Sequence, residues 1–242
     1  MNDVMKTLRR SPRRLLERSG HPGPGPGSLA LVLARAGTGK TAFLTGIGLD
    51  ALLSGQRVLH VSVEANVDRV RDWYDDLLSE LIRAEGSAVN GAEIQAKIEK
   101  ERHIHSFLGG SFSAEKLDET ARTLAERLDF RPQVIVIDRL DRRHNSHDEV
   151  EALRDLAERL GAELWVSARV YREMPDAKEG HLPPPSEQIE DLVDLAFKLE
   201  SEGDRVRLHV LKDHGEILDK NLDVLLDPTT LLLVPEADIA SR

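Results

Sequence analysis

The chain has 242 residues, of which 40% are hydrophobic and 31% are charged, as is typical of a globular protein with a large core. It contains no cysteine, which excludes disulfide bonds and thiolate metal sites. The net charge of -10 disfavours binding to nucleic-acid phosphates, although it does not exclude it. Because the sequence shows neither a long apolar run nor a secretory signal, we expect a cytoplasmic protein without a membrane partner.

The first 27 residues differ in composition from the rest of the chain. Residues 1–20 are strongly basic, and residues 21–27 alternate proline with glycine, which is typical of a linker. We therefore expect a basic arm with its linker at 1–27 and a single folded domain at 28–242. The arm either docks on a neighbouring subunit or is a solvated terminus.

Strand-like and helix-like segments alternate along the folded part. Strands are expected at 28–33, 57–63, 103–108, 134–137 and 164–168, the last two of them buried, and helices at 40–54, 67–85, 113–128 and 149–160. This alternation predicts an α/β fold with a mainly parallel, twisted sheet flanked by helices. Segments 196–200, 206–211, 223–226 and 231–234 are expected to complete the sheet, the later ones as an antiparallel hairpin edge. Residues 86–102 read as mobile or marginally helical, 171–185 as a loop and 187–194 as a helix.

A phosphate-binding loop follows the first strand. The run Ala34-Arg35-Ala36-Gly37-Thr38-Gly39-Lys40-Thr41 fits the P-loop pattern, with alanine at its first position. Glycines let backbone N–H groups turn inward, lysine reaches the β- and γ-phosphates, and the threonine hydroxyl offers a ligand to Mg²⁺. The predicted nucleotide-binding residues are Ala36, Gly37, Thr38, Gly39, Lys40, Thr41 and Ala42.

Polar residues end three other strands. Glu64 follows the second strand and is either the base that activates water or a helix cap. Asp138 ends the apolar run Val134–Ile137 in the manner of a Walker B motif, so Thr41 and Asp138 are the predicted Mg²⁺ ligands. Ser167 is either a polar sensor of the γ-phosphate or a satisfied core residue. Ligands bind at the carboxyl ends of such strands, where all these side chains should meet.

These motifs, in this order, resemble the RecA-like ATPases of the KaiC and DnaB helicase group from about residue 28 to 234. The tracts HIHSFLGGSFSAEKLDETARTLAERLDFRPQVIVIDRLD, SARVYRE and SEQIEDLVDLAFKLE carry the likeness. The resemblance implies ATP as substrate, Mg²⁺ as cofactor, Glu64 as catalytic base and a homo-oligomer with nucleotide at subunit interfaces.

The resembled family also has a late strand that ends Lys-x-Arg-Gly, and its basic residues reach the neighbouring subunit's γ-phosphate. Here Lys212 matches this pattern, and His214 replaces the arginine. The resemblance therefore implies that Lys212 and His214 act in trans. Since a neutral imidazole binds phosphate less well than a guanidinium, the replacement favours slow hydrolysis.

Three functions are compatible with these features. The first is a Mg²⁺-dependent ATPase that works in a ring or filament, with Lys40, Glu64 and Lys212 in catalytic roles. The second is a nucleotide-controlled regulator or scaffold with little hydrolysis. The third is a DNA helicase or recombinase motor, which would need a basic pore. Candidates for the lining of such a pore are Arg139, Arg142, Arg143, Arg169 and Arg172.

Overall fold

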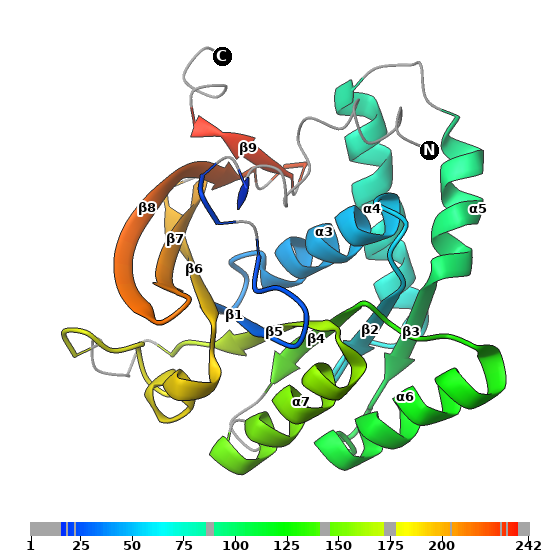
Figure 1. Cartoon of the computed structure of the whole chain (residues 1–242). Coiled ribbons are helices and arrows are strands. Elements are labelled where there is room, and N and C mark those ends of the chain that lie inside the picture. Colours follow the sequence, from blue (N-terminus) through cyan, green and yellow to red (C-terminus); the bar gives the residue numbers. More distant parts are fainter. Residues whose placement is uncertain are drawn as a thin grey trace.

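A computed structural model describes residues 16–17, 19–21, 23–85, 90–140, 146–171, 178–203, 205–227, 229–230 and 232–236. In this part of the chain, the strands form a single nine-stranded sheet in the order β3-β2-β4-β5-β1-β6-β7-β8-β9. Helices cover both faces of its parallel half, and the late strands curve away from it (Figure 1). The predicted α/β class is confirmed.

The parallel half of the sheet contains all five strands predicted between residues 28 and 168. Its members are β3 (Arg102–Ser106), β2 (Val58–Ser62), β4 (Val134–Leu140), β5 (Glu163–Arg169), β1 (Leu29–Ala34) and β6 (Leu195–Glu202). Each pairs in parallel with its neighbour. Every residue of β1 and β2 is buried, because a parallel sheet is covered on both faces. Since β5 inserts between β1 and β4, it separates the P-loop strand from the Walker B strand.

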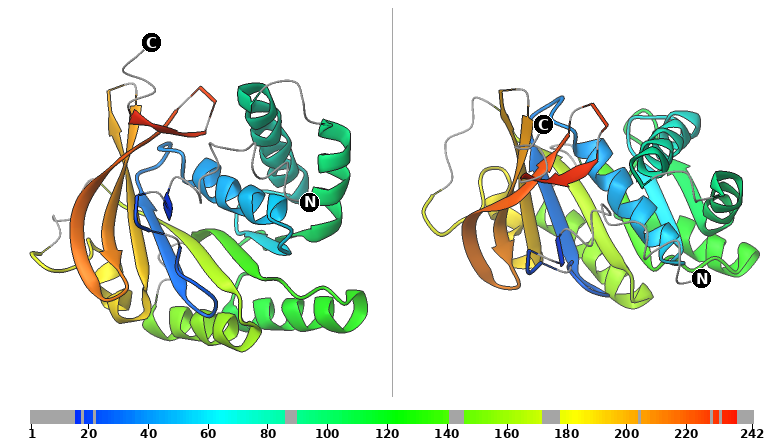
Figure 2. Two further views of the ribbon diagram at one scale, coloured as in Figure 1. Left: turned by 45° about the horizontal axis from the view of Figure 1, so that its top comes forward. Right: turned by 90° about the horizontal axis from the view of Figure 1, so that it is seen from above.

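The late strands turn antiparallel, which confirms the predicted hairpin edge. They are β7 (Arg205–Asp213), β8 (Glu216–Leu226) and β9 (Leu233–Pro235). β6, β7, β8 and β9 pair successively in antiparallel fashion. Figure 2 shows the orange and red strands curling toward the helix that follows the P-loop. The end of β8 therefore reaches the P-loop side of the molecule.

Two helical layers enclose the sheet. On one face lie α3 (Lys40–Leu53), α4 (Val67–Glu85) and α5 (Gly91–Glu101), and on the other lie α6 (Ala114–Leu128) and α7 (His147–Leu160) (Figure 1). The side chains of β1 alternate between the two cores: Ala30 and Val32 face the first layer, and Leu31 and Leu33 face the second. No helix in the described ranges is long and apolar enough to cross a bilayer.

Local sequence explains the helix ends and one element that was underestimated. The hydroxyl of Ser113 accepts a hydrogen bond from the N–H of Lys116 at 3.3 Å and caps α6, as predicted. Residues 86–102 were expected to be mobile or marginally helical, but 91–101 form the ordered helix α5. Asn90 caps that helix, and Ile94 and Ile98 are buried against the core. Burial of this apolar face outweighs the polar composition of the segment.

Two other predicted elements differ in detail. The helix expected at 187–194 is a 3₁₀ helix, Ser186–Leu192. The strand expected at 134–137 continues to Leu140, with a shift in its pairing to β5 between Ile137 and Leu140. This shift marks a β-bulge at the end of the Walker B strand, next to the predicted site.

The described residues of the N-terminal segment lie against the body. Leu16 is fully buried in the same core cluster as the apolar residues of α3. His21 is buried, and its Nδ1 lies 2.7 Å from Oδ2 of Asp213 at the end of β7. Residues 1–15 lie outside the described part of the chain, so the basic arm and the boundary at residue 27 stay predictions.

Candidate functional site

The P-loop connects the central strand β1 to α3, the helix that β8 and β9 approach. Gly37 and Gly39 have φ angles of 76° and 92°, which place both in the left-handed region that favours glycine. Gly39 also has no room for a side chain, because an added Cβ would lie 2.4 Å from Cδ2 of Leu226. Its carbonyl accepts the N–H of Phe43 at 2.9 Å, which starts the helix. The local sequence thus produces the curled loop that the motif predicts.

Lys40 folds back on the loop that carries it. Its Nζ donates hydrogen bonds to the carbonyl oxygens of Ala34 at 3.0 Å and Arg35 at 2.8 Å. Burial lowers the pKa of Lys40 from 10.5 to about 8; the charge of Asp138 opposes this shift, and nearby arginines add to it. The amine is therefore partly desolvated and held at the loop, in position to exchange carbonyl partners for phosphate oxygens.

A chain of hydrogen bonds joins the P-loop to the Walker B strand. The hydroxyl of Thr41 donates to Oδ2 of Asp138 at 2.7 Å, and the hydroxyl of Ser167 donates to Oδ1 at 2.8 Å. The Ser167 oxygen in turn accepts the backbone N–H of Arg139 at 2.8 Å. Burial raises the pKa of Asp138, while hydrogen bonds from Thr41 and Ser167 and the charge of Lys40 oppose the rise.

Ser167 itself is fully buried, and its hydroxyl holds Asp138 and the backbone of Arg139. Within the described residues it does not line the cleft at the P-loop. This geometry favours a packed, satisfied serine that positions Asp138 over one that contacts phosphate directly. The sensor role stays a prediction.

Glu64 occupies a fixed turn after β2. The hydroxyl oxygen of Ser62 accepts a hydrogen bond from the N–H of Ala65 at 2.9 Å. The hydroxyl of Ser106 donates one to the carbonyl of Ala65 at 2.9 Å. Asn66 caps α4 by accepting the N–H of Arg69 at 2.9 Å, so Glu64 is not the cap of that helix. Its carboxylate pairs instead with the guanidinium of Arg139.

An open cleft of about 320 Å³ lies at the P-loop, within the usual size range of small-ligand sites. Glu64 is not among the described residues that line it; its ion-pair partner Arg139 is. The predicted residues that line the cleft are Ala36, Gly37, Gly39, Lys40, Thr41, Ala42 and Asp138; Thr38, which is buried, is not among them. Sequence reasoning did not assign Trp73, Asp76, Leu77, Arg139 or Arg169 to this cleft, although all of them border it. The last two follow the Walker B residue and end β5, and the rule that ligands bind at carboxyl ends could have placed both here.

Arg139 and Arg169 were considered as the lining of a pore, and both border the cleft beside the P-loop of their own chain. The cause is the parallel sheet, whose strands β4 and β5 both end at the P-loop edge. Arg142, Arg143 and Arg172 lie outside the described residues.

The two predicted trans residues lie away from this cleft. Lys212 pairs with Ala196 of β6, and Ala196 pairs with Leu31 in the first half of β1. Lys212 therefore lies toward the amino ends of the parallel strands, whereas the P-loop follows the carboxyl end of β1. Lys212 is buried, and its Nζ donates to the carbonyl of Glu190 at 2.6 Å. His214 has a half-exposed side chain in the β7–β8 turn and contacts Asp213 and the carbonyl of Pro24. Neither residue is among those that line the cleft at the P-loop.

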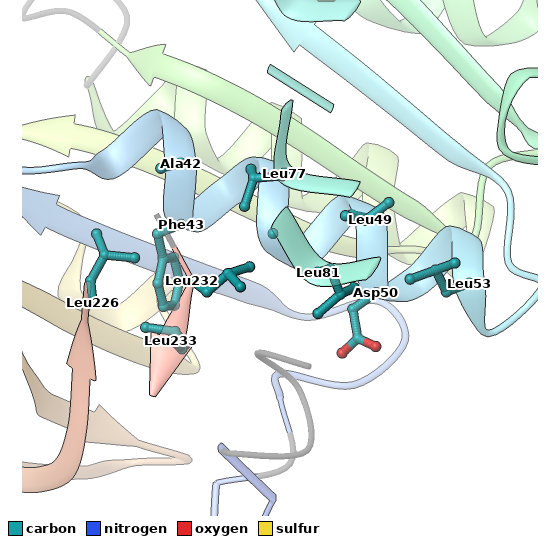
Figure 3. A pocket seen from close by; sticks show the side chains of 11 residues that line it. Ala42, Phe43, Leu49, Asp50, Leu53, Leu77, Leu81, Leu226, Leu232 and Leu233 are labelled. Atoms are coloured by element: carbon teal, nitrogen blue, oxygen red, sulfur yellow. The ribbon is translucent and has the colours of Figure 1, made fainter. Parts of the chain in front are cut away.

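A narrow apolar pocket lies beside the P-loop helix, between α3, α4 and strands β8 and β9. Figure 3 shows Phe43 near Leu226, Leu232 and Leu233, with Leu77 and Leu81 from α4 farther along the helix. Its volume of about 10 Å³ has room for one water molecule at most, so it is a packing defect and not a ligand site. It is bordered by the side chain of Leu226, which also touches Gly39.

Residues 11–171 match the family model described as AAA domain, which is about two-thirds of the chain and includes β1 to β5. The chain belongs to this family. A search of curated proteins finds no match. The match to the AAA domain and the P-loop geometry together indicate, in general terms, a protein of the P-loop ATPase class. The matched range ends before β6, so Lys212 and His214 lie outside it.

Proposed function

We propose that this AAA domain is a Mg²⁺-dependent ATPase. One observation carries the proposal: the hydroxyl of Thr41 lies 2.7 Å from Oδ2 of Asp138, at the mouth of a cleft that also holds Lys40. A P-loop hydroxyl beside a strand-end carboxylate is the arrangement by which P-loop enzymes hold a nucleotide-bound metal. The two groups are 97 positions apart in the chain, so folding and not local sequence joins them.

The donors fit Mg²⁺ in chemical type. Both groups offer hard oxygen ligands, and Mg²⁺ in such sites takes a few protein oxygens together with phosphate oxygens. Asp138 is buried, and a buried carboxylate favours a cation as partner. When bound with nucleotide, the ion would offset negative charge on the β- and γ-phosphates.

The remaining chemistry belongs to the side chains of the chain. Lys40 leaves the carbonyls of Ala34 and Arg35 to bind phosphate oxygens, and the N–H groups of the loop add further donors. Glu64 accepts a proton from water while the water oxygen bonds to the γ-phosphorus. The bond from that phosphorus to the β–γ bridging oxygen breaks, which leaves ADP and inorganic phosphate.

We further infer a homo-oligomer of the kind found in the KaiC and DnaB group, with nucleotide between subunits. Lys212 and His214 lie far from their own P-loop, on an element that could instead reach a neighbour. His214 is half-exposed in a turn, as a residue that contacts another subunit needs to be. For Lys212, the bond to the carbonyl of Glu190 has to break first.

A nucleotide-controlled regulator with little hydrolysis is the second candidate. It is favoured by the ion pair that ties Glu64 to Arg139 and by the histidine at position 214. A DNA motor is less favoured, since the net charge is -10 and Arg139 and Arg169 border the nucleotide cleft.

The test is phosphate release from ATP with Mg²⁺ and with EDTA, using the wild type, Lys40→Ala and Asp138→Asn, with and without single-stranded DNA. The ATPase requires Mg²⁺-dependent release that both substitutions abolish. Tight ATP binding without release indicates the regulator, and stimulation by DNA indicates the motor. If the wild type neither binds nor hydrolyses ATP, the proposal is wrong.

A further inference from the structure

Arg139 occupies a backbone position that side chains other than glycine rarely adopt. Its φ angle is 76°, and it falls within the irregular pairing between β4 and β5. Strained backbone of this kind persists only where surrounding contacts maintain it, and bulges next to active sites redirect a side chain. Here the Ser167 hydroxyl maintains it by accepting the Arg139 N–H at 2.8 Å.

The bulge directs the Arg139 side chain to the nucleotide cleft. Arg139 borders the cleft together with Lys40 and Asp138, and its charge is close enough to Lys40 to lower the pKa of that amine. Its guanidinium pairs with Glu64, the residue proposed to hold the attacking water. Glu64 is not among the described residues that line the cleft, so the ion pair with Arg139 is what connects the proposed base to it.

The resting partner of Arg139 is replaceable. The side chains of Arg139 and Glu64 are 39% and 55% exposed, and an ion pair so open to water contributes little to stability. A γ-phosphate in the cleft carries more negative charge than a carboxylate and can accept two parallel N–H bonds from a guanidinium. The phosphate therefore competes successfully for Arg139 once nucleotide is bound.

From these contacts, and on the basis of the proposed ATPase function, we propose that Arg139 is the arginine that stabilises the transferring phosphate. It acts in cis, on the nucleotide bound by its own chain. Without nucleotide, Arg139 pairs with Glu64. When ATP binds, it moves to the γ-phosphate, stabilises the charge that develops during transfer and releases Glu64 to accept the proton from water. Arg139 thereby fills the role left open by His214, where the resembled family places its trans arginine.

Arg169, the other arginine of the cleft, is a poorer fit to this role. Its guanidinium lies over the ring of Tyr171, 5.0 Å from the centroid, and it ends β5 next to Ala34 at the start of the P-loop. Arg139 is the one whose guanidinium is paired with Glu64 in the described structure.

The experiment compares ATP turnover by the wild type, Arg139→Ala and Arg139→Lys. We expect Arg139→Ala to lower kcat by roughly 100-fold or more, as expected when a charged group that stabilises the transition state is removed. Arg139→Lys should recover part of the loss. The matched control is Arg159→Ala, which removes an arginine paired with Asp118 on α6 and should leave kcat unchanged. Calorimetry with ADP and with ADP–aluminium fluoride should show selective loss of affinity for the transition-state analogue.

A second arm separates cis from trans action. Lys40→Ala subunits keep Arg139 but cannot bind nucleotide, and Arg139→Ala subunits bind nucleotide but lack the arginine. A cis residue predicts that their mixture stays inactive, whereas recovered turnover would place Arg139 in trans and overturn the proposal.

Each remaining outcome also decides the matter. If Arg139→Ala turns over faster than the wild type, Arg139 only restrains Glu64, and its catalytic role is wrong. Unchanged turnover overturns both of its roles but leaves the ATPase proposal intact. If the wild type itself shows no turnover, the ATPase proposal fails, and the catalytic role of Arg139 fails with it.

Discussion

Lys40 shows how a site alters a single residue. Its amine is held against carbonyl oxygens in a partly buried position, and burial lowers its pKa to about 8. A bound polyphosphate adds negative charge beside the amine, which raises the pKa again. The protonation of Lys40 is therefore coupled to nucleotide binding at mildly alkaline pH.

We predict that ATP binding takes up a proton at pH 9. In the free protein at that pH, roughly nine in ten Lys40 side chains are neutral, given a pKa of about 8. Calorimetry in buffers of different ionisation enthalpy should show uptake approaching one proton at pH 9 and much less at pH 7. Lys40→Arg, which stays charged, is the control and should show no uptake at pH 9. Equal uptake in both proteins would contradict the coupling.

Glu64→Gln separates binding from chemistry. The amide keeps the size of the side chain but cannot accept the proton, so turnover should fall by about 100-fold or more while ATP affinity is retained. Phosphate release and calorimetry measure the two effects. Normal turnover by this variant would leave Glu64 with no role beyond its pairing to Arg139.

At the scale of elements, strand β8 touches the P-loop. A Cβ added to Gly39 would lie 2.4 Å from Cδ2 of Leu226 at the end of β8, and the same leucine lines the apolar pocket beside α3. The edge of the sheet is thus packed directly against the phosphate-binding backbone, through a contact between residues that are remote in sequence.

We expect Gly39→Ala to destabilise the protein more than Gly37→Ala. Both glycines have positive φ, but an added Cβ at Gly37 has nothing within 4 Å, whereas at Gly39 it meets Leu226. Leu226→Ala should remove the clash. The double variant should therefore lose about 1 kcal/mol less free energy of unfolding than the two single variants lose together. Urea unfolding of the wild type, Gly39→Ala, Leu226→Ala and the double variant measures this coupling, and strict additivity would rule it out.

A second contact between elements joins the N-terminal segment to the β7–β8 turn. His21 and His214 both contact the carboxylate of Asp213. The hydrogen bond that His214 donates to the carboxylate of Asp213 raises the pKa of His214. Burial alone would raise the pKa of Asp213, but hydrogen bonds from His214 and His21 lower it.

The pH dependence follows from these directions. The His214 contribution is present below its unfolded pKa of about 6.5 and is lost as pH rises through the raised pKa. The Asp213 contribution is present above about 3.8 and is lost as pH falls. The free energy of unfolding should therefore drop by less than about 1 kcal/mol from pH 5.5 to 8, since His214 is half-exposed. Asp213→Asn should show a smaller drop. An equal drop in both proteins would mean that the contact between His214 and Asp213 does not cause the pH dependence.

At the scale of the whole molecule, Lys212 lies away from the P-loop of its own chain, so any role at a nucleotide requires a neighbouring subunit. If Lys212 and His214 act on a neighbour, turnover per subunit should rise with protein concentration as sedimentation shows larger species. His214→Arg should raise it further, because guanidinium stays charged and binds two oxygens. Mixing Lys40→Ala with Lys212→Met subunits should restore part of the activity. A monomer with concentration-independent turnover would leave Arg139 as the sufficient cation.

The sequence by itself determined the features that depend on neighbouring residues. The P-loop was readable because its glycines, lysine and threonine act together within eight positions, and their backbone angles follow from residue type. The buried strands and most helices followed from apolar periodicity for the same reason. Helix α5 was underestimated because its stability comes from burying Ile94 and Ile98 against other elements.

Only the tertiary structure decided how these parts act on one another. The insertion of β5 between β1 and β4 places Ser167 beneath Asp138, and the bulge after Asp138 brings Arg139 to Glu64, 75 positions away. The curl of the late strands brings Leu226 to Gly39 and leaves Lys212 away from its own P-loop. Such contacts depend on strand order and register, which are set by packing over the entire sheet and which no local pattern encodes.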